Sequence, residues 1–177
     1  MNVPVQKVFL VGMMGVGKTT AGRLLAEKLG WPHLDSDEEV VRVAGKPFPQ
    51  LWEEGGEPGF RSLETKVVSE LAASPGEAVV ALGGGAVLDP QNRETIKGAG
   101  LVVWLRADPA TLSERVGDGR GRPLLKSGPA KALKHLSDTR APLYESVADL
   151  VFDVDRMNPR EVAERVASAV KGQPCAS

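Results

Sequence analysis

The chain has 177 residues, 42% hydrophobic and 25% charged, which is the size and composition of one globular domain. Its net charge of −1 gives no overall basic field, so we expect no binding to nucleic acid. No apolar run approaches the roughly 18 residues of a membrane span, so we expect no membrane insertion. The single cysteine, Cys175, cannot form an internal disulfide, and the start MNVPVQK lacks the apolar segment of a signal peptide, so we expect a cytoplasmic protein.

Short apolar runs alternate with longer amphipathic stretches along the chain. The expected strands cover residues 7–12, 32–37, 78–84, 100–107 and 148–154. Three of these runs are continuously aliphatic, as in central strands of a parallel sheet that is covered on both faces. The expected helices cover residues 18–30, 37–45, 63–74, 108–117 and 158–172, and the last two open with Asp108-Pro109 and Asn158-Pro159. The alternation predicts an α/β fold with a doubly wound sheet and right-handed crossovers.

The first strand runs into a glycine-rich loop with the spacing G-x-x-x-x-G-K-T, and a helix pattern follows at once. This arrangement is typical of a P-loop, whose backbone N–H groups and helix dipole hold the phosphates of a nucleotide. Lys18 is expected to reach the β and γ phosphates, and the Thr19 hydroxyl to bind Mg²⁺. The predicted nucleotide site consists of Gly12, Gly15, Val16, Gly17, Lys18, Thr19 and Thr20.

Two carboxylates stand where the second strand should end, in the sequence Asp35-Ser36-Asp37. On an extended chain, side chains at i and i+2 point to the same side, so one carboxylate could support a metal while the other faces a substrate. The same residues also suit the first turn of the following helix, which favours negative charge. The two interpretations are compatible with each other.

Three further features suggest a site at the same edge of the sheet. Gly83-Gly84-Gly85 follows the third strand directly and would let a ligand approach the backbone, although a simple turn is the alternative. Residues 44–60 and 117–129 break the alternating pattern and are expected to be irregular insertions over the carboxyl edge. The second insertion carries Arg120 and Arg122 among glycines, which fits either a lid over phosphates or a plain flexible loop.

Taken together, these pieces resemble shikimate kinase. The matching stretches are GMMGVGKTTAGRLLA, LDSD, FRSLE, LGGGAV, GRPLL and RAPLY, and they keep the order and approximate spacing of that family from residue 7 to about 165. The P-loop is shared by many families, whereas the combination with LGGGAV and RAPLY is specific.

The resemblance implies a single kinase domain over residues 1–177, with a three-layer α/β/α sandwich around a five-stranded parallel sheet. A helical substrate-binding region of about 36–62 and a mobile lid of about 117–129 would flank the site. The enzyme would move the γ-phosphoryl group of ATP to the 3-hydroxyl of shikimate in aromatic amino-acid biosynthesis, with Mg²⁺, as a monomer.

The resemblance also implies a role for individual residues. Asp37 would hold the substrate hydroxyls, and Arg61 and Arg140 would bind the carboxylate, with Gly83, Gly84 and Gly85 beside them. Lys18 and Arg122 would neutralise the phosphates, while Thr19 and Asp35 would serve the metal. Arg115 would stack on adenine, and the segment 156–159, which ends at Pro159, would close the other side. Within this segment, Met157 stands just before Asn-Pro, where the family often has a basic residue.

Two other classes of function remain open at this point: another small-metabolite kinase, and a P-loop switch or regulatory nucleotide-binding module without transfer activity. A gluconate kinase or another kinase of small metabolites would share the P-loop and the lid, but not LGGGAV and RAPLY in these places. A P-loop switch for guanine nucleotides would carry the sequence N-K-x-D, which does not occur in the chain. A binding-only descendant of the kinase would be expected to lose Asp37, Arg122 or Arg140, and all three are present.

Overall fold

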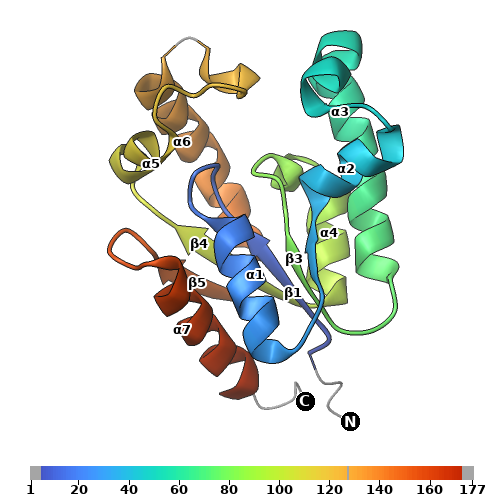
Figure 1. Cartoon of the computed structure of the whole chain (residues 1–177), viewed down its shortest axis with the longest axis vertical. Coiled ribbons are helices and arrows are strands. Elements are labelled where there is room, and N and C mark those ends of the chain that lie inside the picture. Colours follow the sequence, from blue (N-terminus) through green and yellow to red (C-terminus); the bar gives the residue numbers. More distant parts are fainter. Residues whose placement is uncertain (1–4, 127, 173–177) are drawn as a thin grey trace.

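A five-stranded parallel sheet forms the centre of the computed structural model, which describes residues 5–126 and 128–172 (Figure 1). Its strands are β1 (Lys7–Val11), β2 (His33–Asp35), β3 (Ala78–Ala81), β4 (Leu101–Arg106) and β5 (Leu150–Asp153). They lie in the order β2-β3-β1-β4-β5. The predicted α/β class and the five-stranded parallel sheet are therefore confirmed. Cys175 lies outside the described residues.

Burial follows the position of each strand in the sheet. The three central strands β1, β3 and β4 are buried over almost their whole length, as expected for aliphatic runs that are covered on both faces. The edge strand β5 alternates between half-buried and exposed residues, because one of its sides has no neighbouring strand.

Helices cover both faces of the sheet. They are α1 (Lys18–Leu29), α2 (Ser36–Ala44), α3 (Phe48–Ala73), α4 (Pro90–Ala99), α5 (Pro109–Val116), α6 (Pro129–Val147) and α7 (Pro159–Gly172), with short 3₁₀ turns η1 (Ala86–Leu88) and η2 (Pro123–Leu125). Helices α1 and α7 pack against each other on one face, and α4 and α6 contact β4 from the other (Figure 1). This three-layer arrangement leaves the carboxyl ends of the strands open between the α2–α3 region and the segment that carries η2.

The prediction of an irregular insertion over residues 44–60 is wrong for most of its length. Helix α3 begins at Phe48 and continues to Ala73 with one kink at Gly56, whose φ of 61° and ψ of −169° interrupt the helical geometry. Pro58 lies two residues after the kink, where a helix is starting again and a missing N–H is tolerated. Arg61 consequently lies within α3, after the kink, and not before the helix expected over residues 63–74.

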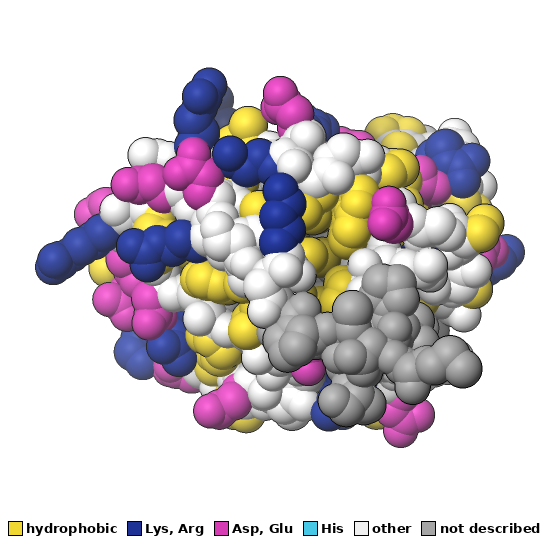
Figure 2. All heavy atoms as spheres, turned by 90° about the horizontal axis from the view of Figure 1, so that it is seen from below, with side chains coloured by type: hydrophobic (Ala, Val, Ile, Leu, Met, Phe, Trp, Pro, Cys, Tyr) yellow, Lys and Arg dark blue, Asp and Glu magenta, His cyan; other side chains and the backbone are white. Residues whose placement is uncertain are grey.

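The end of the molecule away from the open edge carries mixed charge. Figure 2 views this end and shows cationic and anionic side chains interspersed among its described residues. No helix among the described residues is long and apolar enough to cross a membrane.

Candidate active site

A cleft of about 760 Å³ opens over the carboxyl ends of β1, β2 and β3. Because these strands are parallel neighbours, the segments that follow them meet at one edge of the sheet. Residues from the P-loop, α2, α3, the glycine triplet, the η2 segment and α6 line the cleft. They include Lys18, Thr19, Thr20, Asp35, Asp37, Arg61, Gly83, Gly84, Gly85, Arg122 and Arg140.

The P-loop adopts a closed turn around its own lysine. Gly17 precedes α1 with a φ of 96°, a conformation that side chains other than glycine rarely adopt. The Lys18 ammonium donates to the carbonyl oxygens of Gly12 at 2.7 Å and Met13 at 3.0 Å. Burial lowers the pKa of Lys18 to about 8, against the opposing pull of Asp37 and Asp35. The ammonium is thus held at the base of the loop, inside the cleft.

Asp35 connects the P-loop helix to α2. Its Oδ2 accepts a hydrogen bond from the Thr19 hydroxyl at 2.7 Å, and its Oδ1 caps α2 by accepting from the N–H groups of Asp37 and Glu38. A hydroxyl and a carboxylate beside a phosphate loop are hard oxygen donors of the kind that suits Mg²⁺. No cluster of three or more His, Cys, Asp or Glu that could hold a metal occurs in residues 5–126 and 128–172, and a magnesium ion held mainly by phosphates and water does not need one.

Asp37 lies in the first turn of α2, so the extended geometry assumed for the pair Asp35 and Asp37 is not what the structure has. The helical interpretation of these acidic residues is the correct one, and Asp37 nevertheless faces the cleft. Surrounding protein displaces water from its carboxylate, and this raises the pKa of Asp37 above the ordinary value, with a further contribution from Asp35. Lys18 and Arg61 oppose that shift, which means that both cations lie near this carboxylate.

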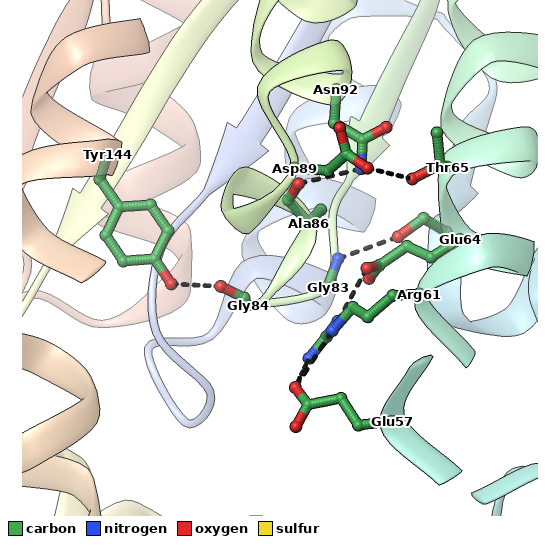
Figure 3. Close-up of polar contacts among 11 residues, drawn as sticks. Glu57, Arg61, Glu64, Thr65, Gly83, Gly84, Ala86, Asp89, Asn92 and Tyr144 are labelled. Carbon is green, nitrogen blue, oxygen red and sulfur yellow. Dashed lines mark hydrogen bonds and ion pairs between the residues drawn. The ribbon is translucent and has the colours of Figure 1, made fainter. Parts of the chain in front are cut away.

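Arg61 is held by two carboxylates of its own helix (Figure 3). Its Nη1 donates to Glu64 at 2.7 Å, and its Nε and Nη2 share one oxygen of Glu57 at 3.3 Å. The guanidinium also lies 5.3 Å from the ring centre of Phe60. These contacts fix the orientation of the guanidinium toward the cleft.

Arg140 has a different environment, although it faces the same cleft. It is only 2% exposed, and no carboxylate of the described residues forms an ion pair with it. One turn further along α6, the Tyr144 hydroxyl donates to the Gly84 carbonyl at 2.6 Å (Figure 3). A buried cation without an internal anion is suited to an anionic ligand, because an unpaired buried charge is costly.

The glycine triplet gives room to the charged side chains. A Cβ at Gly83 would lie 2.6 Å from Asp37 Oδ1 and 2.8 Å from Glu64 Oε1, and one at Gly85 would collide with the Arg61 guanidinium. A Cβ at Gly84 would come within 3.4 Å of Arg140 Nη1. Three consecutive glycines therefore exceed the needs of a turn, because four site residues occupy the space beside them.

Arg122 lines the cleft from the glycine-rich segment and caps η2. Its Nη1 is buried and has no hydrogen-bond partner. Leu125, which is 2% exposed, anchors the same segment in the core. Glycines 117, 119, 121 and 128 all have positive φ, a backbone conformation that leaves the segment able to turn sharply around this anchor.

The residues expected around adenine do not line this cleft. Arg115 donates to the carbonyl oxygens of Val16 at 3.3 Å and Val154 at 3.0 Å, so it joins the P-loop to the end of β5. Met157 packs half-buried against the core, and Pro159 is exposed at the start of α7. Gly12 and Val16 belong to the loop but also lie outside the cleft lining.

Sequence reasoning missed two polar residues beside the arginines of the site. Glu64 and Tyr144 were not singled out, although each lies one helical turn from an arginine of the site and such spacing brings side chains together. Trp52 lies on the same helix as Arg61. It forms a cluster with Phe48 and Phe60, with ring centres 5.0 to 5.8 Å apart, and this cluster is one wall of the cleft.

Comparison with known proteins agrees with this geometry. The shikimate kinase family profile matches residues 14–171. A shikimate kinase from Thermobifida fusca is 46% identical over 89% of this chain and 91% of that protein. The structure of a shikimate kinase from Acinetobacter baumannii in complex with shikimate superposes with a TM-score of 0.92 and 38% identity, covering 97% of this chain and 96% of that one.

The gluconate alternative has weaker support. A gluconokinase from Sinorhizobium meliloti superposes with a TM-score of 0.63 at 21% identity, which shows a shared fold alone. The profile match over most of the chain and the identity to relatives of similar length decide between the two. The chain belongs to the shikimate kinase family, and it is an ATP-dependent kinase.

Proposed function

We propose that this chain transfers the γ-phosphoryl group of ATP to the 3-hydroxyl of shikimate, with Mg²⁺ as the metal cofactor. One observation carries the proposal: Asp37, Arg61, Gly84 and Arg140 line the same cleft as the Lys18 ammonium. They come from three helices and the loop after β3, and the charges of Asp37 and Arg140 reach far enough to affect the pKa of Lys18. A small carboxylated polyol fits this set of groups.

The substrate would bind by its two ends. Its carboxylate would lie between Arg61 and Arg140, since a guanidinium offers a planar fork that matches a carboxylate. Its hydroxyls would donate to Asp37, while Gly84 would contact the ring through its backbone. The fixed Gly84 carbonyl supports this role, because the Tyr144 hydroxyl holds that peptide in one orientation.

The phosphates would lie along the P-loop residues Gly12 to Thr20. Lys18 and Arg122 would neutralise charge on the transferred group, and the unpartnered Arg122 Nη1 supports this role for the glycine-rich segment of about 117–129 as a lid. Mg²⁺ would be held by the Thr19 hydroxyl, with Asp35 behind it, and would supply neutralisation of phosphate charge. Adenine would lie beside Arg115, with Met157 giving an apolar contact and Pro159 closing the other side.

Phosphoryl transfer through a loose transition state needs only a weak general base. The bond between the γ-phosphorus and the bridging oxygen of ADP breaks as a bond to the 3-hydroxyl oxygen forms, and the transition state is loose. Asp37 would orient the hydroxyl and accept its proton late. Burial raises the pKa of this carboxylate above its ordinary value, which makes it a better proton acceptor than an exposed aspartate.

A binding titration tests the proposal. Shikimate should bind the protein with measurable heat, and a nonhydrolysable ATP analogue with Mg²⁺ should change its affinity, since both ligands occupy one cleft. Gluconate and nucleoside monophosphates should give no saturable heat under the same conditions. Saturable binding of gluconate without binding of shikimate would contradict the assignment.

We further propose that the chain works as one kinase domain and as a monomer in the cytoplasm, with the substrate-binding region at about residues 36–62. Every group assigned above comes from one chain, so the site needs no second copy. Size-exclusion chromatography with light scattering should give the mass of a single chain, 18.8 kDa.

A further inference from the structure

The carboxyl group of Glu64 is buried next to the substrate-binding cations and is only half satisfied. Its side chain is 1% exposed, and one oxygen, Oε2, accepts from Arg61 Nη1 at 2.7 Å. The other oxygen, Oε1, is buried and has no hydrogen-bond partner. An ionised carboxylate in this state is costly, because a buried acceptor without a donor keeps its desolvation penalty.

Charges on two neighbouring helices face this group from around the cleft. Burial raises the pKa of Glu64 to about 7, the positive charges of Arg61 and Arg140 lower it, and the negative charge of Asp37 raises it. Tyr144, on α6 with Arg140, also lies within electrostatic range. Asp37 Oδ1 and Glu64 Oε1 both border Gly83, so two carboxylate oxygens lie close together there.

A count of the donors on Arg61 shows what a bound substrate would change. A guanidinium has five N–H groups. Glu57 engages Nε and Nη2, and Glu64 engages Nη1, which leaves one N–H on each of the two terminal nitrogens. A substrate carboxylate at this free edge would be the third carboxylate around the Arg61 guanidinium. The same substrate carboxylate would also contact Arg140.

We propose that Glu64 takes up a proton when shikimate binds, so that this buried acid is neutral in the substrate complex. The inference rests on the proposed function, because it needs a carboxylate at Arg61 and Arg140. An added negative charge and the loss of water from the cleft both favour the uncharged form of the acid. Glu57 shares the same arginine, but its side chain is 42% exposed, so it lacks the burial that distinguishes Glu64.

The proton would occupy Oε1, the oxygen that has no partner. It would turn this atom into a donor next to the Asp37 carboxylate and would remove the repulsion between the two acids. The site would then keep Asp37 as its charged group for the substrate hydroxyls. Glu64 therefore acts as a positioning residue whose charge changes with occupancy.

Proton uptake makes substrate affinity depend on pH. The pKa of Glu64 is higher in the complex than in the free protein, so shikimate binds with constant affinity below about pH 7 and more weakly above it. The dissociation constant should rise by up to about tenfold per pH unit until the pKa of the complex is reached.

Calorimetric titration of shikimate at pH 7.5, in phosphate, HEPES and Tris, measures the proton directly. Observed enthalpy plotted against buffer ionisation enthalpy should give an uptake of roughly one half to three quarters of a proton per shikimate, because about a quarter of Glu64 is already protonated in the free protein at this pH. Glu64→Gln should bind shikimate with no uptake. The matched control is Glu57→Gln, which removes a carboxylate from the same helix and the same arginine and should keep the uptake.

Three results separate the possibilities. Shikimate binding with no proton uptake by the unmodified protein would overturn the inference and leave the proposed function intact, whereas no binding at all would overturn both. Equal uptake by the unmodified protein and Glu64→Gln would assign the proton elsewhere and also overturn the inference. The fall of affinity above pH 7 in the unmodified protein gives a test that does not depend on any variant.

Discussion

At the scale of single residues, the two arginines of the site differ in how much charge they have left for a ligand. Arg61 is shared by Glu57 and Glu64, whereas Arg140 is buried and forms no ion pair within the described part of the chain. The positive charge available to a substrate carboxylate therefore comes mainly from Arg140. Arg61 contributes a fixed direction more than a free charge.

Replacing Arg140 by methionine should weaken shikimate binding strongly. The substitution keeps most of the buried volume but removes the cation, and loss of one partner of a buried charge pair costs roughly 2–5 kcal/mol. We expect KM for shikimate to rise at least about 30-fold with a smaller change in KM for ATP. Steady-state kinetics measures both, and an unchanged KM for shikimate would remove Arg140 from the substrate site.

Asp37→Asn should bind ATP normally and lose most of its turnover. The amide keeps the size of the side chain but can neither accept the proton nor hold the hydroxyl in the same way. Proton transfer by a positioned group contributes typically 10²–10⁴-fold, so we expect kcat to fall by at least about 100-fold. A kcat close to that of the unmodified enzyme, in a variant that still binds nucleotide, would argue against the role of Asp37.

At the scale of elements, glycines and short segments decide where the charged groups can lie. Gly83→Ala would bring a methyl group to 2.6 Å from Asp37 Oδ1 and 2.8 Å from Glu64 Oε1. Both contacts are with the ends of side chains, which can move, so thermal stability should change little. The displaced carboxylates should lower kcat/KM for shikimate, by up to about 100-fold for a shift of about 1 Å.

Gly98→Ala in α4 is the control for that experiment. A Cβ at Gly98 would contact nothing within 4 Å, and alanine is a better helix former than glycine. This variant should keep full activity and melt at an equal or higher temperature. Equal activity of Gly83→Ala and Gly98→Ala would show that the space beside Gly83 is not needed.

The glycine-rich segment should act on the phosphates and not on shikimate. Arg122→Ala removes a cation from the transferred group, so kcat should fall by about 100-fold or more while shikimate affinity changes modestly. Stopped-time assays of ADP release give kcat, and calorimetry gives the affinity. A collapse of shikimate binding in this variant would contradict the assignment of the segment as a phosphate lid.

The sequence was most informative where local chemistry and local structure coincide. The P-loop, the three buried strands and the helices that open with Asp-Pro or Asn-Pro could be predicted, because each has its own short signal. Helix α4 opens with Asp89-Pro90 in the same way and could have been found. Helix α6 was missed because Pro142 lies inside it, and the first half of α3 because Gly56 and Pro58 resemble a loop.

At the scale of the whole molecule, the site depends on the order of the strands. The segments after β1, β2 and β3 meet because these strands are neighbours, although their residues are up to about 70 positions apart in the chain. No local pattern gives the strand order β2-β3-β1-β4-β5, and the sequence analysis predicts none; that these residues share one site was expected from the family resemblance. The pairing of Arg61 with Glu57 and Glu64 has the i,i+4 and i,i+3 spacing of a helix, and it was missed because residues 44–60 were expected to be irregular.

The central claim is that one cleft joins a phosphate loop to a site for a carboxylated polyol. Initial rates of ADP release with ATP and Mg²⁺, measured in parallel with shikimate, gluconate and nucleoside monophosphates, test it most directly. Saturable turnover is expected with shikimate alone, and this turnover should be lost in Asp37→Asn. Turnover with another acceptor and none with shikimate, from protein that binds ATP, would contradict it.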